Sequence, residues 1–520
     1  MRHETIGSEA APRRRLSIVR VGVALVLAGG AVVGASFAFR EVRASPESVP
    51  APWYAPYVDV TITPTFAFED SSANPSRDVV LSFIVADPEE RCTPSWGAAF
   101  DLDAAATDLD LDRRIARYRQ QGGDVVVSFG GAINDELATV CTDIDDLADA
   151  YRAVIDRYDV TTIDLDIEAD DLADDAGSSR RGEAVATVQA QVRNDGGSLA
   201  VWLTLPVAPS GLPADAVATI DAMLEAGVDL AGVNLMTMNY GAGRDDDESM
   251  HAASVRAIEA AHRQLSSAYQ RIDQRLSYEQ VHAKIGVTPM IGQNDDRGDV
   301  FTLDDAESTV DYVNSEGLGR LGMWSLNRDN PCGPNSTPSS TPSNFCTSLD
   351  QDPLTFSEIF AAVAARPGGQ AGIETVPLDG PPPIDDPATA PYPIWDGDDG
   401  FSAGDKTVWR GSVYESKWWN EGEAPDAPVI NEWETPWRLI GPVLATDRPP
   451  PPPPTIPLGT FDDWDGTEIY EEGARVHYDG FGYESKWWNQ GEQPGKDVPN
   501  DWDTPWFLID ASGEPVDAQR

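Results

Sequence analysis

The segment Thr162–Glu168 carries acidic side chains at every second position, namely Asp164, Asp166 and Glu168, with Ile or Leu between them. Alternate side chains of a β-strand point to opposite faces, so a strand formed here would present all three carboxyl groups on one face. Three such groups close together cannot all stay ionised at low cost, and we expect at least one raised pKa. A raised pKa suits a general acid that works near neutral pH.

The three acids have different expected roles. Glu168 is the outermost and is best placed to give a proton to a bound substrate, while Asp166 and Asp164 are expected to share a proton behind it. No further carboxylate is placed as a nucleophile and the five His residues are scattered, so we predict neither a metal site nor a cofactor. The alternative is an edge strand with solvated acids, which would leave its aliphatic face without a packing partner.

Eight short β-rich runs alternate with longer helical segments and would position these acids. The runs are Val58–Phe68, Val79–Val85, Asp124–Phe129, Thr162–Glu168, Leu199–Pro206, Gly232–Met238, Lys284–Met290 and Arg320–Leu326. Most are hydrophobic almost without a break, as strands covered on both faces should be. Amphipathic segments such as Asp145–Tyr158 lie between them, and the last helix is placed at Leu354–Ala365. This alternation predicts an α/β fold of the (β/α)8 TIM-barrel class.

The acidic strand resembles the Asp-x-Asp-x-Glu end of the fourth-strand motif of glycoside hydrolase family 18, which has chitinases among its members. The segment Ser128–Gly131 is similar to the third-strand Ser-x-Gly-Gly of that family, and Gly322–Trp324 resembles the end of its eighth strand. The resemblance covers roughly residues 58–365. It implies a barrel whose substrate-binding residues include Ser128 and whose Trp324 underlies the sugar being cleaved.

The same resemblance assigns catalytic roles. It makes Glu168 the proton donor and Asp166 the residue that orients the substrate acetamido group, with Asp164 in support. The nucleophile is then the N-acetyl oxygen of the substrate itself, an exception to the usual scheme with two carboxylates. This accounts for the missing second carboxylate.

Two segments depart from the family pattern. Thr161 and Thr162 stand where the family has Asp-Gly, a change expected to affect packing more than protonation. On the sixth strand, Met238 stands where Tyr is expected and Asn239 where Asp or Asn is, so Tyr240 is a candidate to supply the phenol. Three residues after the seventh strand would face the active end, although ordinary loop residues would look the same: Met290, Gln293 and Asn294.

The C-terminal part contains two copies of one motif. Lys417–Asn420, which reads Lys-Trp-Trp-Asn, recurs 69 positions later as Lys486–Asn489, and the copies align without a gap. Most of the 15 Trp residues lie in this part of the chain. Between the copies, Pro449–Pro454 is an unbroken proline run that predicts a stiff spacer.

The copies resemble chitin-binding modules of carbohydrate-binding families 5 and 12, whose pattern includes Tyr-x-x-Lys-Trp-Trp. In each Trp pair we expect one ring in the core and the other exposed for stacking on a sugar. The alternative that every Trp is core is disfavoured, because two such small cores could not enclose so many. The candidate binding residues are Trp418, Trp419, Trp487, Trp488, Tyr414 and Tyr483.

Charge and the N-terminal segment bear on the partners and the compartment. The chain has 37 Lys and Arg against 87 Asp and Glu, a net charge of −50 that disfavours nucleic acid as a partner. Val21–Phe39 are uncharged, mostly apolar and preceded by several Arg, which predicts a signal or transmembrane anchor that contacts the membrane and exports the rest. Outside the cell, we expect disulfides Cys92–Cys141 and Cys332–Cys346, with free thiols as the alternative.

These features predict six parts and one activity. The boundaries are 1–52 for a tail with the apolar segment, 53–365 for the barrel, 366–390 for a linker, 391–441 for the first module, 442–459 for a Pro-rich linker and 460–510 for the second module. The expected protein is an extracellular, endo-acting chitinase, either secreted or tethered. It would act on chitin or another N-acetylglucosamine polymer without an obligate protein partner. The alternatives are an endo-β-N-acetylglucosaminidase on glycans and a chitin-binding surface protein with an inactive barrel.

Overall fold

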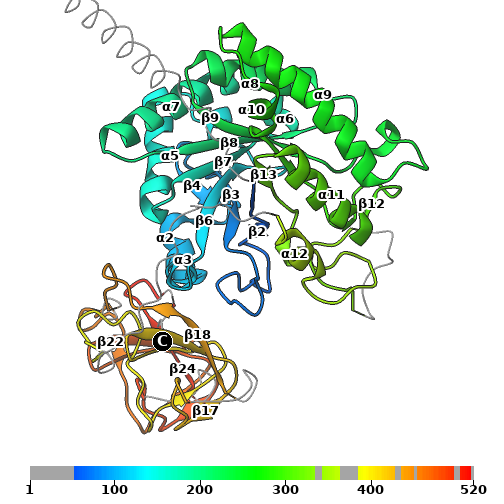
Figure 1. Ribbon diagram of the computed structural model, residues 1–520. Helices are drawn as coiled ribbons and strands as arrows, with labels where there is room; N and C mark the ends of the chain where they lie inside the picture. Colours follow the sequence, from blue (N-terminus) through cyan, green and yellow to red (C-terminus); the bar gives the residue numbers. More distant parts are fainter. Residues whose placement is uncertain are drawn as a thin grey trace, which may run out of the picture. The chain divides into compact units, whose positions relative to one another are not determined.

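The structure is a computed structural model (Figure 1). It describes residues 52–333, 342–363, 384–427, 435–449, 454–496, 504–513 and 515–516. The predicted apolar segment Val21–Phe39, much of the linker 366–390 and most of the proline run lie outside the described residues.

The expectation of a membrane tether needs correction. None of the helices within the described ranges has the length and apolar character needed to cross a membrane. The segment Val21–Phe39, on which that expectation rested, lies outside the described residues.

A mostly parallel sheet forms the centre of the large α/β domain. Its eleven strands are β1 (Trp53–Tyr54), β2 (Tyr57–Asp59), β3 (Asp78–Ala86), β4 (Pro94–Trp96), β5 (Phe100–Asp101), β6 (Asp124–Gly130), β7 (Thr162–Asp166), β8 (Ala200–Pro206), β9 (Leu230–Met236), β10 (Ile285–Thr288) and β13 (Arg320–Leu321). They follow the order β1-β13-β10-β9-β8-β7-β6-β3-β4-β5, and β2 pairs with β3. Only β4 and β5 are antiparallel to their neighbours.

Helices follow the strands and pack side by side in chain order (Figure 1). They are α2 (Leu102–Asp108), α3 (Leu111–Gln120), α4 (Leu137–Val140), α5 (Ile144–Tyr158), α6 (Ala169–Leu172), α7 (Asp175–Asn194), α8 (Ala214–Glu225), α9 (Met250–Arg271), α10 (Tyr278–His282), α11 (Leu303–Glu316) and α12 (Thr355–Phe360). Short elements complete the domain: β11 (Gly292–Gln293), β12 (Val300–Phe301), and the 3-10 helices η1 (Gly241–Gly243) and η2 (Leu326–Arg328).

Local sequence explains where these helices begin and end. Asp143 caps α5 by accepting hydrogen bonds from the first turn, whose N–H groups have no partner within the helix. Thr302 and Asp305 cap α11 reciprocally, and Gly317 ends it in the left-handed conformation that glycine adopts at low cost.

Most of the predicted runs become strands within a few residues of their expected bounds, and the first run is the exception. Its pairing is made by β1 and β2, N-terminal to most of Val58–Phe68. Pro64 lies in the later part of that run and has no N–H to give to a ladder. Both predicted disulfides, Cys92–Cys141 and Cys332–Cys346, are confirmed.

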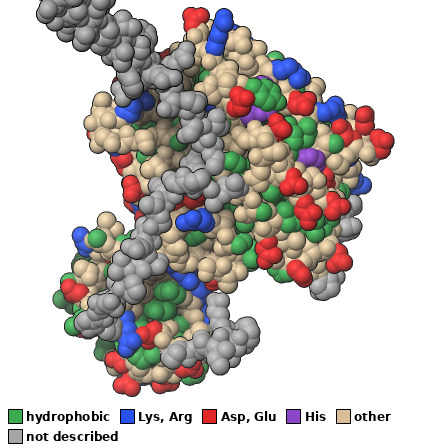
Figure 2. All heavy atoms as spheres, in the orientation of Figure 1, with side chains coloured by type: hydrophobic (Ala, Val, Ile, Leu, Met, Phe, Trp, Pro, Cys, Tyr) green, Lys and Arg blue, Asp and Glu red, His purple; other side chains and the backbone are tan. Residues whose placement is uncertain are grey.

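The C-terminal part forms small, mostly antiparallel sheets in two units. The first unit contains β14 (Gly400–Phe401), β15 (Lys406–Trp409), β16 (Ser412–Ser416), β17 (Asn420–Glu421) and β18 (Trp437–Pro442). The second contains β19 (Asp462–Asp463), β20 (Ile469–Tyr470), β21 (Arg475–Tyr478), β22 (Phe481–Ser485), β23 (Asn489–Gln490) and β24 (Trp506–Ile509). We call these the first and second C-terminal units. On the face drawn in Figure 2, acidic side chains outnumber basic ones, as expected from the net charge.

Candidate active site

Strand β7 positions the three acids as the alternation predicts. Ile163, Leu165 and Ile167 are fully buried in the main core, while Asp164 and Asp166 lie on the opposite face. The chain stays extended beyond the last strand residue, because the Ile167 N–H donates to the Thr204 carbonyl of β8 at 3.0 Å. Glu168, at φ −131° and ψ 171°, is still extended and precedes α6. The alternative of an edge strand is excluded, since β7 pairs with β6 and β8.

Asp164 lies at the centre of a buried hydrogen-bond network. One oxygen accepts from Arg320 at 2.5 Å and from Thr204 at 2.7 Å. The other oxygen accepts from Ser128 at 2.7 Å and from Tyr57 at 2.9 Å. The two oxygens together therefore accept hydrogen bonds from four donors. This arrangement differs from the expectation that Asp164 and Asp166 share a proton.

Arg320 is a site residue that the sequence interpretation missed. Its guanidinium is fully buried and lies 5.3–5.6 Å from the ring centroids of Trp53, Tyr57 and Trp202. The Asp164 carboxylate compensates for the removal of this charge from water. The sequence did contain a signal for this role, because Arg320 stands at the start of an otherwise apolar strand.

Asp166 and Glu168 both have raised pKa values. Burial raises the pKa of Asp166 well above its usual range, and the neighbouring Glu168 and Asp164 raise it further. Burial, together with the Asp295 carboxylate, raises the pKa of Glu168 to about 7. Glu168 is therefore a carboxylic acid that can hold its proton near neutral pH.

One oxygen of Asp166 is available to a ligand. Its Oδ1 is buried and has no hydrogen-bond partner within the described ranges. A buried acceptor without a donor costs free energy, and a bound N–H group would supply that donor.

Asp295 forms the rim of the site together with Asn239. The Asn239 side chain donates to Asp295 at 2.9 Å, and the Asp295 N–H donates back to the Asn239 side chain at 2.9 Å. The structure adds an electrostatic role, because this carboxylate raises the pKa of Glu168.

Aromatic rings lie next to the acid network. Trp324 follows β13, is only partly buried, and stacks on Phe83 with ring centroids 5.6 Å apart and planes 24° apart. Tyr57 contacts the same Trp at 6.1 Å and also bonds Asp164, so it links the rings to the acids. Met290 forms a backbone bridge with Trp324.

Gly130 is required by the close approach of β6 and β7. A Cβ added at this position, where φ is +96°, would lie 2.1 Å from the Asp166 carbonyl oxygen. The following Gly131 N–H donates to that same carbonyl at 2.8 Å. These glycines hold the backbone of Asp166, and with it the acids, in place.

The remaining predicted residues are mostly structural. Tyr240 does not supply a phenol to the acids, because it is buried with its hydroxyl 3.0 Å from Ser254 of α9. Met238 is also buried. Gln293 gives its amide hydrogens to loop carbonyls, and Asn294 does the same, so both organise the loop after β10.

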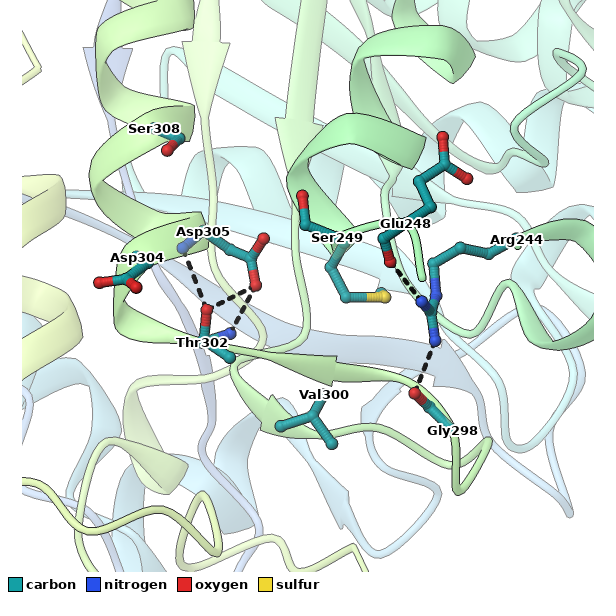
Figure 3. A pocket seen from close by; sticks show the side chains of 10 residues that line it. Arg244, Glu248, Ser249, Gly298, Val300, Thr302, Asp304, Asp305 and Ser308 are labelled. Carbon is teal, nitrogen blue, oxygen red and sulfur yellow. Dashed lines mark hydrogen bonds between the residues drawn. The ribbon is translucent and has the colours of Figure 1, made fainter. Parts of the chain in front are cut away.

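A separate pocket of about 330 Å³ lies where the loop after β9 meets the start of α11 (Figure 3). Its lining includes none of the three acids. Arg244 donates there to the carbonyls of Glu248 and Gly298, and Thr302 bonds Asp305. These contacts hold the loops and cap α11, so we assign the pocket to packing rather than to chemistry.

The C-terminal units show which of the predicted aromatic binding residues are exposed. Both rings of each Trp pair are exposed, at 43% and 55% for Trp418 and Trp419 and at 42% and 56% for Trp487 and Trp488. The expectation of one core ring in each pair is therefore wrong. Trp437 and Trp506 fill the cores instead. Tyr414 and Tyr483 are partly buried.

Comparisons with known proteins relate part of this chain to chitinases. No family model matches it. A probable bifunctional chitinase/lysozyme of Escherichia coli is 35% identical over 59% of this chain and 34% of that protein. Endochitinase 11 of Metarhizium anisopliae is 34% identical over 55% of this chain and 54% of that protein. The chain thus spans about a third to a half of the length of these curated relatives.

A solved structure supports the fold. The catalytic domain of a hyperthermophilic chitinase from Pyrococcus furiosus is 29% identical over 60% of this chain and 94% of that chain, with a TM-score of 0.51. The α/β domain is therefore chitinase-like, with a mostly parallel central sheet. These relatives are named chitinases, which are glycoside hydrolases.

Proposed function

We propose that this chain is a chitinase of glycoside hydrolase family 18 type, which hydrolyses β-1,4-linked N-acetylglucosamine polymers. The observation that carries the proposal is the raised pKa of Glu168 at the end of a strand with two further buried acids. The named relatives support the substrate class. We further propose that the parallel sheet closes into a (β/α)8 barrel, since β1 pairs with β13 while β2, three residues later, pairs with β3.

Glu168 acts as the general acid in this mechanism. Its proton passes to the glycosidic oxygen as the bond from that oxygen to the anomeric carbon breaks. The N-acetyl oxygen of the same sugar attacks the anomeric carbon, and water later opens the resulting ring with overall retention. Glu168 then takes a proton from that water, which returns it to its starting state.

Asp166 and Trp324 position the sugar. The unpartnered oxygen of Asp166 accepts the acetamido N–H, which aims the acetamido oxygen at the anomeric carbon. Trp324, stacked on Phe83, forms a flat apolar floor for the ring. Arg320 holds Asp164 in place behind them.

The two C-terminal units hold the enzyme on its polymer. Exposed Trp pairs offer flat faces to the C–H faces of sugar rings, and two units on one chain raise the effective concentration of the active site at the surface. This tail favours a polymer over the glycans of a glycoprotein. The domain boundaries remain as predicted from the sequence.

Internal cleavage is the expected mode. Only β11, β12 and α11 lie between β10 and β13, so no inserted domain deepens the cleft at this point. An open cleft admits the middle of a chain. A time course on chitin that is dominated by dimers from the first minutes would contradict this mode.

The test of the proposed activity is the Glu168→Gln variant of the full chain. Turnover of chitohexaose should fall by about 10²- to 10⁴-fold, the usual contribution of a general acid. Asp170→Asn, which changes an exposed carboxylate two residues away, should keep parent activity. Unchanged hydrolysis by Glu168→Gln would remove the assignment.

A further inference from the structure

The two C-terminal units share one framework but differ at one exposed position. Glu415 on β16 lies opposite Arg438 on β18, and the equivalent Glu484 on β22 lies opposite Phe507 on β24. The strand register therefore shows that Phe507 occupies the place of Arg438. The sequence repeat gives the same equivalence.

In the second unit this position extends an apolar surface. Phe507 is 46% exposed, comparable to Trp487 at 42%. The Lys486 ammonium lies 4.7 Å from the Phe507 ring centroid and 5.9 Å from that of Trp487. The two rings therefore flank one Lys, and Phe507 continues the surface that Trp487 and Trp488 begin.

In the first unit the same position is charged and engaged. Arg438 donates to both oxygens of Glu415 at 3.0 Å, and its side chain is 40% exposed. Covering such a pair with a sugar removes water from two charges, which costs free energy that an apolar ring does not require. The two units therefore differ at this position, although the second unit has its own partly exposed ion pair, between Arg475 and Glu484 at 2.8 Å.

Two further positions differ in the same direction. The second unit exposes Ile469 where the first has Gly400, and it has Gln490 where the first has Glu421. Ile469 and Gln490 are paired across β20 and β23, and β23 begins directly after Trp488. At these two positions the second unit carries more apolar area and less charge than the first.

We infer that the second C-terminal unit is the principal contact with chitin and that Phe507 takes up an additional sugar ring beside Trp487 and Trp488. This inference rests on the proposed function, because it presumes that the Trp pairs bind the polymer. The ligand is a neutral N-acetylglucosamine chain, whose C–H faces stack on flat aromatic rings.

The test uses the full chain carrying Glu168→Gln, so that insoluble chitin is bound and not consumed. Trp487→Ala with Trp488→Ala should weaken adsorption more than Trp418→Ala with Trp419→Ala. In the latter background, which isolates the second unit, Phe507→Ala should weaken adsorption by about three- to tenfold, the usual range for an aromatic contact. In the background of Trp487→Ala with Trp488→Ala, which isolates the first unit, Arg438→Ala should change adsorption by less than about twofold.

A fifth variant separates stacking from simple bulk. Phe507→Leu keeps an apolar side chain on β24 without a flat ring and should weaken adsorption as much as Phe507→Ala. Full adsorption by Phe507→Leu, equal losses from the two Trp pairs, or an equal loss from Arg438→Ala would each overturn the inference. The melting temperature of each variant should match that of the parent, since the changed side chains are exposed.

The outcome also separates this inference from the function on which it rests. If removing the Trp pairs of both units leaves adsorption unchanged, the proposed chitin-binding role of the tail is wrong. If that variant loses adsorption but Phe507→Ala does not, the role stands and the inference about the second unit is wrong.

Discussion

The acid site and the exposed Trp pairs use opposite surroundings. Asp164 and Asp166 are almost wholly buried, whereas the four paired Trp rings of the C-terminal units are 42–56% exposed. At the acid site, burial raises the pKa of Glu168 and fixes its neighbours. In the C-terminal units, exposure leaves flat apolar faces free to meet a polymer. In our proposal both regions contact chitin, one to break a glycosidic bond and one to hold the polymer.

The ion pairs of the two regions show the same contrast. Arg320 and Asp164 are fully buried at 2.5 Å, while Arg438 and Glu415 are partly exposed at 3.0 Å. Removing one partner of a buried pair leaves a charge without water or counter-ion. Removing one partner of an exposed pair returns the other to solvent. The loss of stability when one partner of a pair is replaced therefore measures how far that region depends on the exclusion of water.

Replacing Arg320 should have the largest effect. Arg320→Met should lower the free energy of unfolding of the α/β domain by about 3 to 5 kcal/mol, because Asp164 is left buried and unpaired. Arg438→Met should cost less than about 1 kcal/mol, as exposed pairs do. Urea denaturation measures both. The comparison breaks if the two variants lose equal stability, or if adding Asp164→Asn to Arg320→Met restores none of it.

Removing the exposed rings should affect one substrate only. A full chain with Trp418, Trp419, Trp487 and Trp488 changed to Ala should hydrolyse solid chitin about tenfold more slowly, since the effective concentration at the surface is lost. Hydrolysis of soluble chitohexaose should stay within about twofold of the parent. Initial rates on both substrates provide the measurement. Equal losses on both would mean that the tail supports the fold of the α/β domain.

The smallest expected effect comes from Asp295 at the rim. Asp295→Asn removes a negative charge that raises the pKa of Glu168, so the alkaline limb of the rate profile should move to lower pH. The maximal rate on the acid side should be unchanged. Asp296→Asn, one residue further on, is the matched control and should leave the limb in place. A limb that does not move for Asp295→Asn would remove the electrostatic role of this residue.

The central strand could be predicted because its signal is local, as is that of the Cys332–Cys346 disulfide, whereas Cys92 and Cys141 are 49 positions apart. The alternation along Thr162–Glu168 places the three acids on one face as soon as the segment forms a strand. The Cys92–Cys141 pairing requires in addition that the strands before the two cysteines be neighbours, as they are in a barrel-like order of elements. Arg320 could not be placed in the same way. Its partner Asp164 lies 156 positions earlier, and only the parallel sheet brings them together.

The errors in the Trp pairs and the sixth strand have one physical origin. Sequence interpretation assigned a ring of each pair to the core, but Trp437 and Trp506 already fill it and donate their ring N–H groups to the Glu423 and Glu492 carbonyls. Tyr240 likewise turned to a helix partner instead of the acids. Composition shows how many rings a unit has, whereas packing decides which ones are covered.

The pH dependence of kcat/KM on chitohexaose tests the central claim most directly. Because the folded state raises the pKa of Glu168 to about 7, the protonated acid is present below that pH and is lost above it. The rate should therefore fall tenfold per pH unit on the alkaline side, beginning near pH 7. A rate that stays level from pH 6 to about pH 9 would contradict a mechanism in which Glu168 donates the proton.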